Sequence, residues 1–159
     1  MSHPFLAEIG QVAAQFALLE LQLELTVGSL LFGGRLETQA LGRIVTAELS
    51  FRKQVDLMSA LWRYRNPSAD DRKLRKVAAS LLAAERERNT IIHSSWFLAE
   101  EDQVLRVKTT AKGKLMTKSE KVKPSDIRAI AEKIGEAGSQ LMEFCFPSSG
   151  PGPRLSDVL

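Results

Sequence analysis

The chain has 159 residues, of which 44% are hydrophobic and 26% charged, and its formal net charge is +3. This length suits one domain with a buried core, and the composition is that of an ordinary globular protein. The single cysteine, Cys145, excludes an intrachain disulfide, and only His3 and His93 could join it in a structural zinc site. We therefore expect neither a metal site nor a cofactor, and we expect the reducing cytoplasm as the compartment.

The N-terminal region has the pattern of a long core helix. Apolar residues recur at alternating spacings of three and four, which predicts a helix from Pro4 to Phe32 that ends at Gly33-Gly34. The first residues lack the basic segment of a signal peptide, and polar side chains interrupt the apolar stretch, so we expect no membrane span. Further leucines and alanines widen the apolar stripe. Such a helix must be covered on more than one side, by its own bundle or by a second chain.

Shorter helical patterns follow. Residues 37–46 predict a short helix, and Ser50 is a suitable N-cap for the next helix. That helix has the sequence FRKQVDLMSALWRYR, and its inward positions are Val55, Met58, Leu61 and Trp62. The sequence Asn66-Pro67-Ser68 then breaks the helical pattern, and we expect Ser68 to cap a long helix that ends near Ile92.

The pattern changes again from Trp96 onward. The segments WFLA and VLRVK, separated by a polar turn, predict two short strands, and residues 112–114 predict a loop. Pro124 suits the first position of a final helix, with Asp126 in its first turn. The last residues are rich in proline, glycine and serine, a composition typical of disorder.

Together these elements predict an all-α protein. We expect an up-and-down helical bundle of four to five helices, with a small β-hairpin inserted before the last helix. The helical domain covers residues 1–146, with the hairpin insertion at about 96–123, and residues 147–159 form a disordered C-terminal tail.

Basic residues are concentrated between Arg106 and Lys123. This strip contains seven cations and one carboxylate, Glu120. A local positive strip favours binding to a polyanion, and the candidate RNA-binding residues are Lys108, Lys112, Lys114 and Lys118. Solvated lysines in a mobile loop are the more common explanation of such a strip, and the sequence leaves both interpretations open.

The segment ERNTIIHSSW, residues 87–96, carries the candidate catalytic residues Arg88, Asn89 and His93. At 100° per residue, Asn89 and His93 are about 40° apart on a helix, whereas Arg88 and His93 are about 140° apart. Arg88 therefore needs either its long, flexible side chain or a second copy of the helix to meet His93. Two copies related by a two-fold axis would line one cleft with both sets of residues.

These side-chain types suit phosphoryl transfer without a metal. Histidine titrates near neutral pH, so it can take a proton from a ribose 2′-hydroxyl or give one to a leaving 5′-oxygen. Guanidinium is a permanent planar cation that matches phosphate oxygens, and an amide can orient the substrate. A structural interpretation remains beside this one: Arg88 could pair with a carboxylate, and His93 could cap the end of its helix.

The segment from Arg88 to His93, RNTIIH, resembles the R-N-x-x-x-H form of the R-x(4–6)-H motif of the HEPN family. The order of elements is also similar: a long leucine-rich first helix, a helix containing SFRKQVDLMSAL, and then ERNTIIHSSW. The resemblance covers residues 4 to 145. It implies an all-α bundle in which Arg88 and His93 are the catalytic pair and Asn89 is the supporting polar residue.

The resemblance further implies a homodimeric, metal-independent endoribonuclease of a toxin–antitoxin, phage-defence or RNA-processing system, with RNA and an antitoxin or other defence protein as partners. One feature departs from a subgroup of the family: Ser95 stands two residues after His93, where that subgroup has a tyrosine. The alternative function is a non-catalytic dimeric helical module that binds nucleic acid, a nucleotide or a protein.

Overall fold

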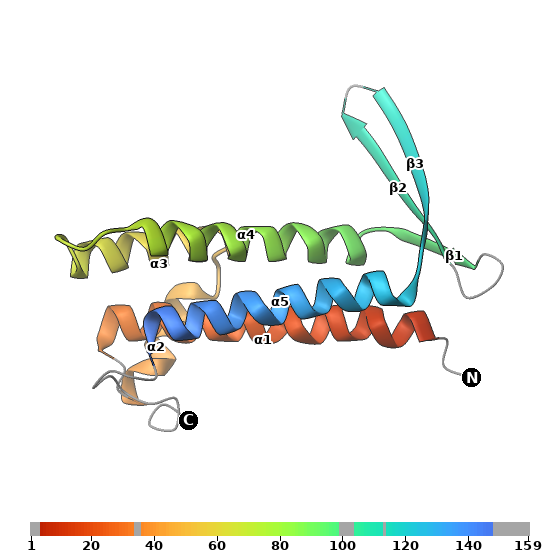
Figure 1. The fold of residues 1–159 in the computed structure, drawn as a ribbon. Helices are drawn as coiled ribbons and strands as arrows, with labels where there is room; N and C mark the ends of the chain where they lie inside the picture. Colours follow the sequence, from red (N-terminus) through yellow and green to blue (C-terminus); the bar gives the residue numbers. More distant parts are fainter. Residues whose placement is uncertain (1–3, 34–35, 99–103, 113, 148–159) are drawn as a thin grey trace.

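The computed structural model describes residues 4–33, 36–98, 104–112 and 114–147. Over this part of the chain it shows a helical bundle with a small antiparallel sheet before the last helix (Figure 1). The helices are α1 (Pro4–Phe32), α2 (Leu36–Thr46), α3 (Phe51–Arg65), α4 (Arg72–Ile92) and α5 (Pro124–Cys145). The strands are β1 (Ser95–Leu98), β2 (Val104–Lys112) and β3 (Lys114–Val122). The predicted disorder of the tail concerns residues that, from 148 onward, lie outside the described ones.

The long helices form two layers, with α1 beside α5 and α3 beside α4 (Figure 1). Helices α1 and α5 run parallel, because Glu8 pairs with Arg128 near both helix starts and Gln15 approaches Gly135 further along. Helix α4 runs in the opposite direction. The sequence pattern predicts an up-and-down bundle, but the helices do not alternate strictly in direction.

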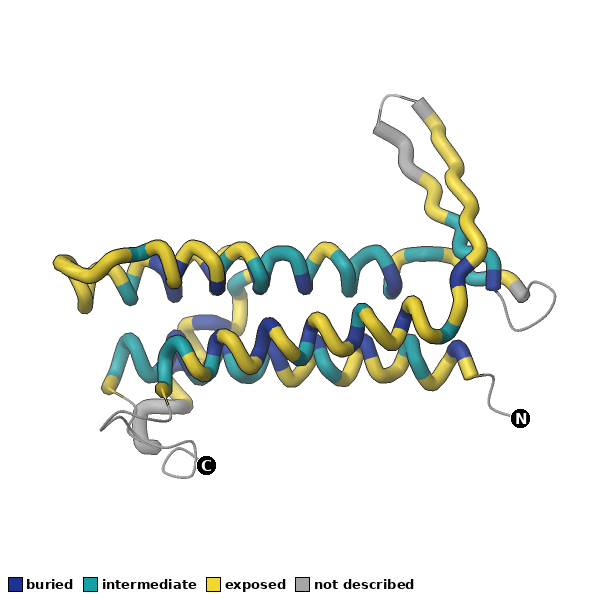
Figure 2. The backbone as a smooth tube through the Cα atoms, viewed as in Figure 1, coloured by how far each residue is buried: buried dark blue, intermediate teal, exposed yellow. Residues whose placement is uncertain are grey.

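The core lies between these two layers (Figure 2). Its fully buried large side chains come from every long helix: Val12, Leu19, Leu23, Val27, Val55, Met58, Leu74, Leu81, Ile91, Ile127, Ile134 and Leu141. The predicted inward face of α3 is confirmed, since Val55 and Met58 are buried and Leu61 and Trp62 pack against the core. By length and composition α1 is the one described helix that could cross a membrane, but its buried face supplies much of this core.

The helix ends follow local hydrogen bonding. The prediction for Ser50 is confirmed, because its Oγ accepts a hydrogen bond from the backbone N–H of Lys53 at 3.4 Å. The prediction for Ser68 is wrong. Helix α4 begins only at Arg72, since the preceding turn extends to Asp71, whose carboxylate pairs with two arginines instead of capping the helix. Pro124 does open α5, and the carboxylate of Asp126 accepts from the backbone N–H of Lys123 at 2.9 Å.

The predicted hairpin is incomplete, because the sheet has three strands in the order β1-β2-β3. Strand β3 was not predicted, because its sequence KLMTKSEKV lacks the apolar alternation of a half-buried strand. The reason is the exposure of this strand, which is exposed at every residue from 115 to 121 (Figure 2). Strands β2 and β3 pair over nine positions and project from the bundle as a two-stranded ribbon (Figure 1). We call this pair of strands the ribbon.

Candidate functional site

The RNTIIH segment, residues 88–93, occupies the last turns of α4 and its C-cap. The backbone N–H of His93 donates to the carbonyl oxygen of Asn89 at 3.1 Å, which closes the helix. Just beyond, the indole N–H of Trp96 donates to the carbonyl oxygen of Ile91 at 3.1 Å, and its ring packs against the core. These contacts fix the end of the helix and therefore the position of the candidate residues.

Arg88 lies half-buried between α4 and α1. Its Cζ is 5.1 Å from the centroid of the Phe16 ring, which places a cation over an aromatic face. Its Nη1 donates to Oδ1 of Asn89 at 2.9 Å, while its Nε is buried and has no hydrogen-bond partner among the described residues. Phe16 itself is only 3% exposed, so the guanidinium is directed inward.

The carboxyl group of Glu20 lies close enough to this guanidinium to feel its charge, but the two groups form no ion pair. Burial raises the pKa of the Glu20 carboxyl group; the positive charge of Arg88 opposes this shift, whereas Glu24 and Glu85 add to it. Within the described ranges no ion pair involves Arg88. The structural alternative of a simple arginine–carboxylate pair is therefore not realised, and the amide of Asn89 and the ring of Phe16 take its place.

His93 is placed differently from Arg88. Its side chain is exposed, and in the part of the chain that the structure describes it makes no hydrogen bond or ion pair. The structure thus brings Arg88 and Asn89 together and leaves His93 outside this pair, at the solvent-facing end of α4. The imidazole is free to meet a ligand, and the helix end is capped by the backbone of His93 and not by its side chain.

The ribbon orders the basic strip by face. Directly opposed residues share a face of a sheet, and successive pairs alternate between its two faces. From the bundle outward, one face carries the buried pair Val104–Val122, then Arg106 and Glu120, which form an ion pair at 2.5 Å. The next pair on this face is Lys108 with Lys118, both exposed.

The outermost pair of the same parity is Lys112 with Lys114, whose side chains lie outside the described ones. All four lysines that the sequence predicts to bind RNA therefore have the same parity in the strand pair. Lys121 has the other parity, since it is opposed to Leu105. Like charges directly opposite each other destabilise a strand pair. Lys108 and Lys118 are such a pair, and an anion bound between them would reduce the repulsion.

The C-terminal end of α4, where His93 is the C-cap, and the ribbon lie at the same end of the bundle (Figure 1). Strand β1 begins at Ser95, two residues after His93, and Ser95 pairs with Val107 of β2. The base of the ribbon is consequently tied to the end of α4.

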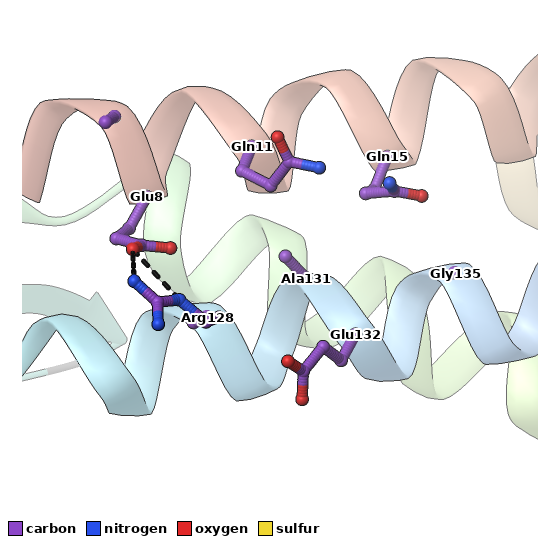
Figure 3. A pocket seen from close by; sticks show the side chains of 8 residues that line it. Glu8, Gln11, Gln15, Arg128, Ala131, Glu132 and Gly135 are labelled. Atoms are coloured by element: carbon purple, nitrogen blue, oxygen red, sulfur yellow. Dashed lines mark hydrogen bonds and ion pairs between the residues drawn. The ribbon is translucent and has the colours of Figure 1, made fainter.

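A separate cavity of about 420 Å³ lies between α1 and α5 (Figure 3). It is lined by the amides of Gln11 and Gln15, and the ion pair between Glu8 and Arg128 borders it. No residue of the RNTIIH segment lines this cavity. No group of three His, Cys, Asp or Glu side chains in the described ranges is arranged to hold a metal ion.

Sequence analysis did not identify Phe16 and Glu20 as neighbours of Arg88. Phe16 belongs to the apolar stripe of α1, and Glu20 lies one turn later, so only the crossing of α1 with α4 reveals the contact.

Comparison with family models, characterised proteins and solved structures finds no match for this chain.

Proposed function

We propose that this protein is a metal-independent endoribonuclease that acts as a homodimer, as its resemblance to the HEPN family implies. The observation that carries the proposal is the position of an exposed, unpaired histidine at the same end of the bundle as a lysine-bearing ribbon. The ribbon would hold the RNA phosphates, and His93 would act on the strand that passes the end of α4.

The proposed reaction is attack of a ribose 2′-oxygen on the adjacent phosphorus. His93 accepts the 2′-hydroxyl proton, the bond between phosphorus and the 5′-oxygen breaks, and the 5′-oxygen takes a proton from a protonated histidine or from water. The products are a 2′,3′-cyclic phosphate and a 5′-hydroxyl. Arg88 would stabilise the charge on the phosphate oxygens, and Asn89 would orient the guanidinium through the hydrogen bond it already accepts.

A dimer is part of this proposal for a geometric reason. Arg88 points toward α1, while His93 faces solvent, so one chain does not gather both side chains around one phosphate. A two-fold partner would bring its own exposed His93 to the half-buried Arg88 of the first chain. Which toxin, antitoxin or phage-defence system the enzyme serves would follow from the protein that copurifies with it.

The test is cleavage of a mixed RNA by the purified protein in excess chelator. We expect cleavage that leaves cyclic phosphate ends and that is lost in His93→Ala, a change of about 10²- to 10⁴-fold for a general acid or base. A wild type that cleaves no RNA, or a His93→Ala variant that cleaves at the wild-type rate, would refute the enzyme.

A second candidate function is an RNA-binding module without catalysis. The inward contacts of Arg88 favour it, because an arginine committed to Phe16 and Asn89 has a structural role of its own. This candidate predicts RNA binding that depends on the ribbon, equal in wild type and His93→Ala, and no cleavage products.

A further inference from the structure

The lysine-bearing face of the ribbon also carries an apolar side chain. Met116 is opposed to Thr110, which gives it the parity of Lys108 and Lys118 and places it one pair further from the bundle. Met116 is 50% exposed, and its neighbour Leu115, on the opposite face, is 71% exposed. Neither residue belongs to the hydrophobic core or packs against it.

No packing within the described part of the chain accounts for this exposure. The other described residues in the outer half of β3, Thr117, Lys118 and Ser119, are polar, as expected for a ribbon that is solvated on both faces. An exposed apolar side chain at the outer end of a strand pair favours unwanted association. Methionine is unbranched and flexible, so its side chain can adapt to a narrow apolar gap.

We propose that Met116 is an apolar wedge that enters between two stacked bases of RNA while Lys108 and Lys118 hold the phosphates beside that step. Met116 and Lys118 are two positions apart on β3, a separation of about 6.8 Å along the strand. Proteins that kink nucleic acid insert apolar side chains, methionine and leucine among them, in the same way. The inference rests on the proposed function only in that the ribbon binds RNA.

Such a wedge would prepare RNA for the proposed chemistry. Attack by the 2′-oxygen requires that this oxygen, the phosphorus and the 5′-oxygen lie in line, and regular A-form stacking holds them away from that geometry. Unstacking one step releases the nucleotide from this constraint at a cost of a few kcal/mol. The ligand class is therefore stacked or base-paired RNA, which is recognised by its backbone and shape more than by its sequence.

A lipid surface would be the other partner for basic and apolar side chains together. The register argues against it, because Leu115 and Met116 lie on opposite faces of the ribbon and cannot form one apolar face against a bilayer. Among the described side chains beyond Lys108 and Lys118 on the lysine-bearing face, Met116 is the one apolar group, and it is the size of a single inserted side chain.

The experiment uses the full chain with His93→Ala, so that the bound RNA stays intact. The probe is a hairpin RNA with 2-aminopurine in its stem, whose fluorescence rises when the base leaves the stack. We expect binding to raise the fluorescence, and Met116→Ser to remove that rise while the salt dependence of binding stays the same, because the lysine contacts with the phosphates are retained. Met116→Leu, which retains an apolar side chain, should keep the rise. Lys108→Gln with Lys118→Gln should weaken binding, because fewer counterions are released.

A fluorescence rise that persists in Met116→Ser would overturn the wedge, as would binding without any rise. Vesicles with phosphatidylserine provide the last arm: vesicle binding that Met116→Ser abolishes, with hairpin binding intact and its signal unchanged, would assign the residue to a lipid surface. Circular dichroism verifies that each variant is folded. The two proposals can fail independently. RNA cleavage without unstacking would refute the wedge and not the nuclease, whereas unstacking by a wild type that does not cleave RNA would refute the nuclease and not the wedge.

Discussion

Arg88 packs against Phe16, with its Cζ 5.1 Å from the centroid of the aromatic ring. The contact joins α4 to α1 and lies beside the hydrogen bond from Arg88 to Asn89. Arg88 therefore has a structural role whatever its part in catalysis. His93, four residues after Asn89, has no such side-chain contact within the described part of the chain. Measurements of stability can consequently distinguish the structural role of Arg88 from that of His93 before any activity is measured.

We expect Arg88→Ala to lower the free energy of unfolding by about 1–2 kcal/mol, because a partly desolvated cation–π contact and a hydrogen bond are lost. His93→Ala should change it by less than about 0.5 kcal/mol, as for most surface substitutions. Urea denaturation provides the measurement, with Arg86→Ala as the control, since Arg86 is exposed on the same helix. Equal losses for Arg88→Ala and Arg86→Ala would show that the contact with Phe16 adds no stability.

The faces of the ribbon give a second prediction. If the lysine-bearing face holds RNA phosphates, changing Lys108 and Lys118 to glutamine should weaken binding and lower the slope of log K against log salt by about 0.7–0.9 for each phosphate contact. Lys121→Gln is the matched control, because Lys121 has the opposite parity on β3. RNA binding measured at several salt concentrations distinguishes lysines that contact phosphates from lysines that are only solvated. Equal slopes for all variants would return these lysines to the class of solvated charges.

Burial of Glu20 gives a prediction about pH. The pKa of its carboxyl group is raised above 4.5 in the folded protein, first by burial and then by Glu24 and Glu85, against the attraction of Arg88. The unfolded chain therefore releases this proton more readily, so ionisation of Glu20 costs stability as pH rises above 4.5. We expect Glu20→Gln to raise the melting temperature at pH 7. The gain should disappear below pH 4.5, where both states are protonated. A gain that is the same at pH 7 and pH 4 would contradict this cause.

The sequence predicts those elements whose residues pack on the core. Helix α1 begins and ends where its apolar spacing predicts, and Ser50 caps α3 because both signals are local. Strand β3 escapes prediction because its stability comes from pairing with β2 and not from a buried face. The same distinction holds for the candidate site. Helical spacing alone relates Asn89 to His93, whereas the contact of Arg88 with Phe16 depends on how α1 and α4 cross.

The close approach of α2 to α1 gives a prediction about packing. A Cβ at Gly42 would lie 2.7 Å from the Cα of Gly28, a backbone atom that cannot move alone. We expect Gly42→Ala to destabilise the protein by about 1–3 kcal/mol through overpacking. At Gly10, also helical, a Cβ would meet nothing within 4 Å. Gly10→Ala should instead stabilise by about 0.5–1 kcal/mol, since alanine favours helix. Thermal unfolding of both variants compares them, and a stable Gly42→Ala variant would refute the tight contact.

The last prediction concerns assembly. Apolar side chains remain exposed on α1 and α2, among them Leu18 at 48% and Ile44 at 70%. We expect a second chain to cover exposed apolar side chains of these helices, as the wide apolar stripe of α1 requires. Light scattering at micromolar concentration should give twice the mass of one 17.6 kDa chain.

Leu18→Glu and Ile44→Glu should each shift the protein toward the monomer, because a charge would be buried at the interface. Tyr64→Glu serves as the control, since Tyr64 is 85% exposed at the end of α3. A mass of one chain for the wild type would remove the dimer from the proposal. If the active cleft needs residues from both copies, the monomeric variants should lose RNA cleavage while their His93 and ribbon stay intact. Monomers that cleave as fast as wild type would place the whole site within one chain.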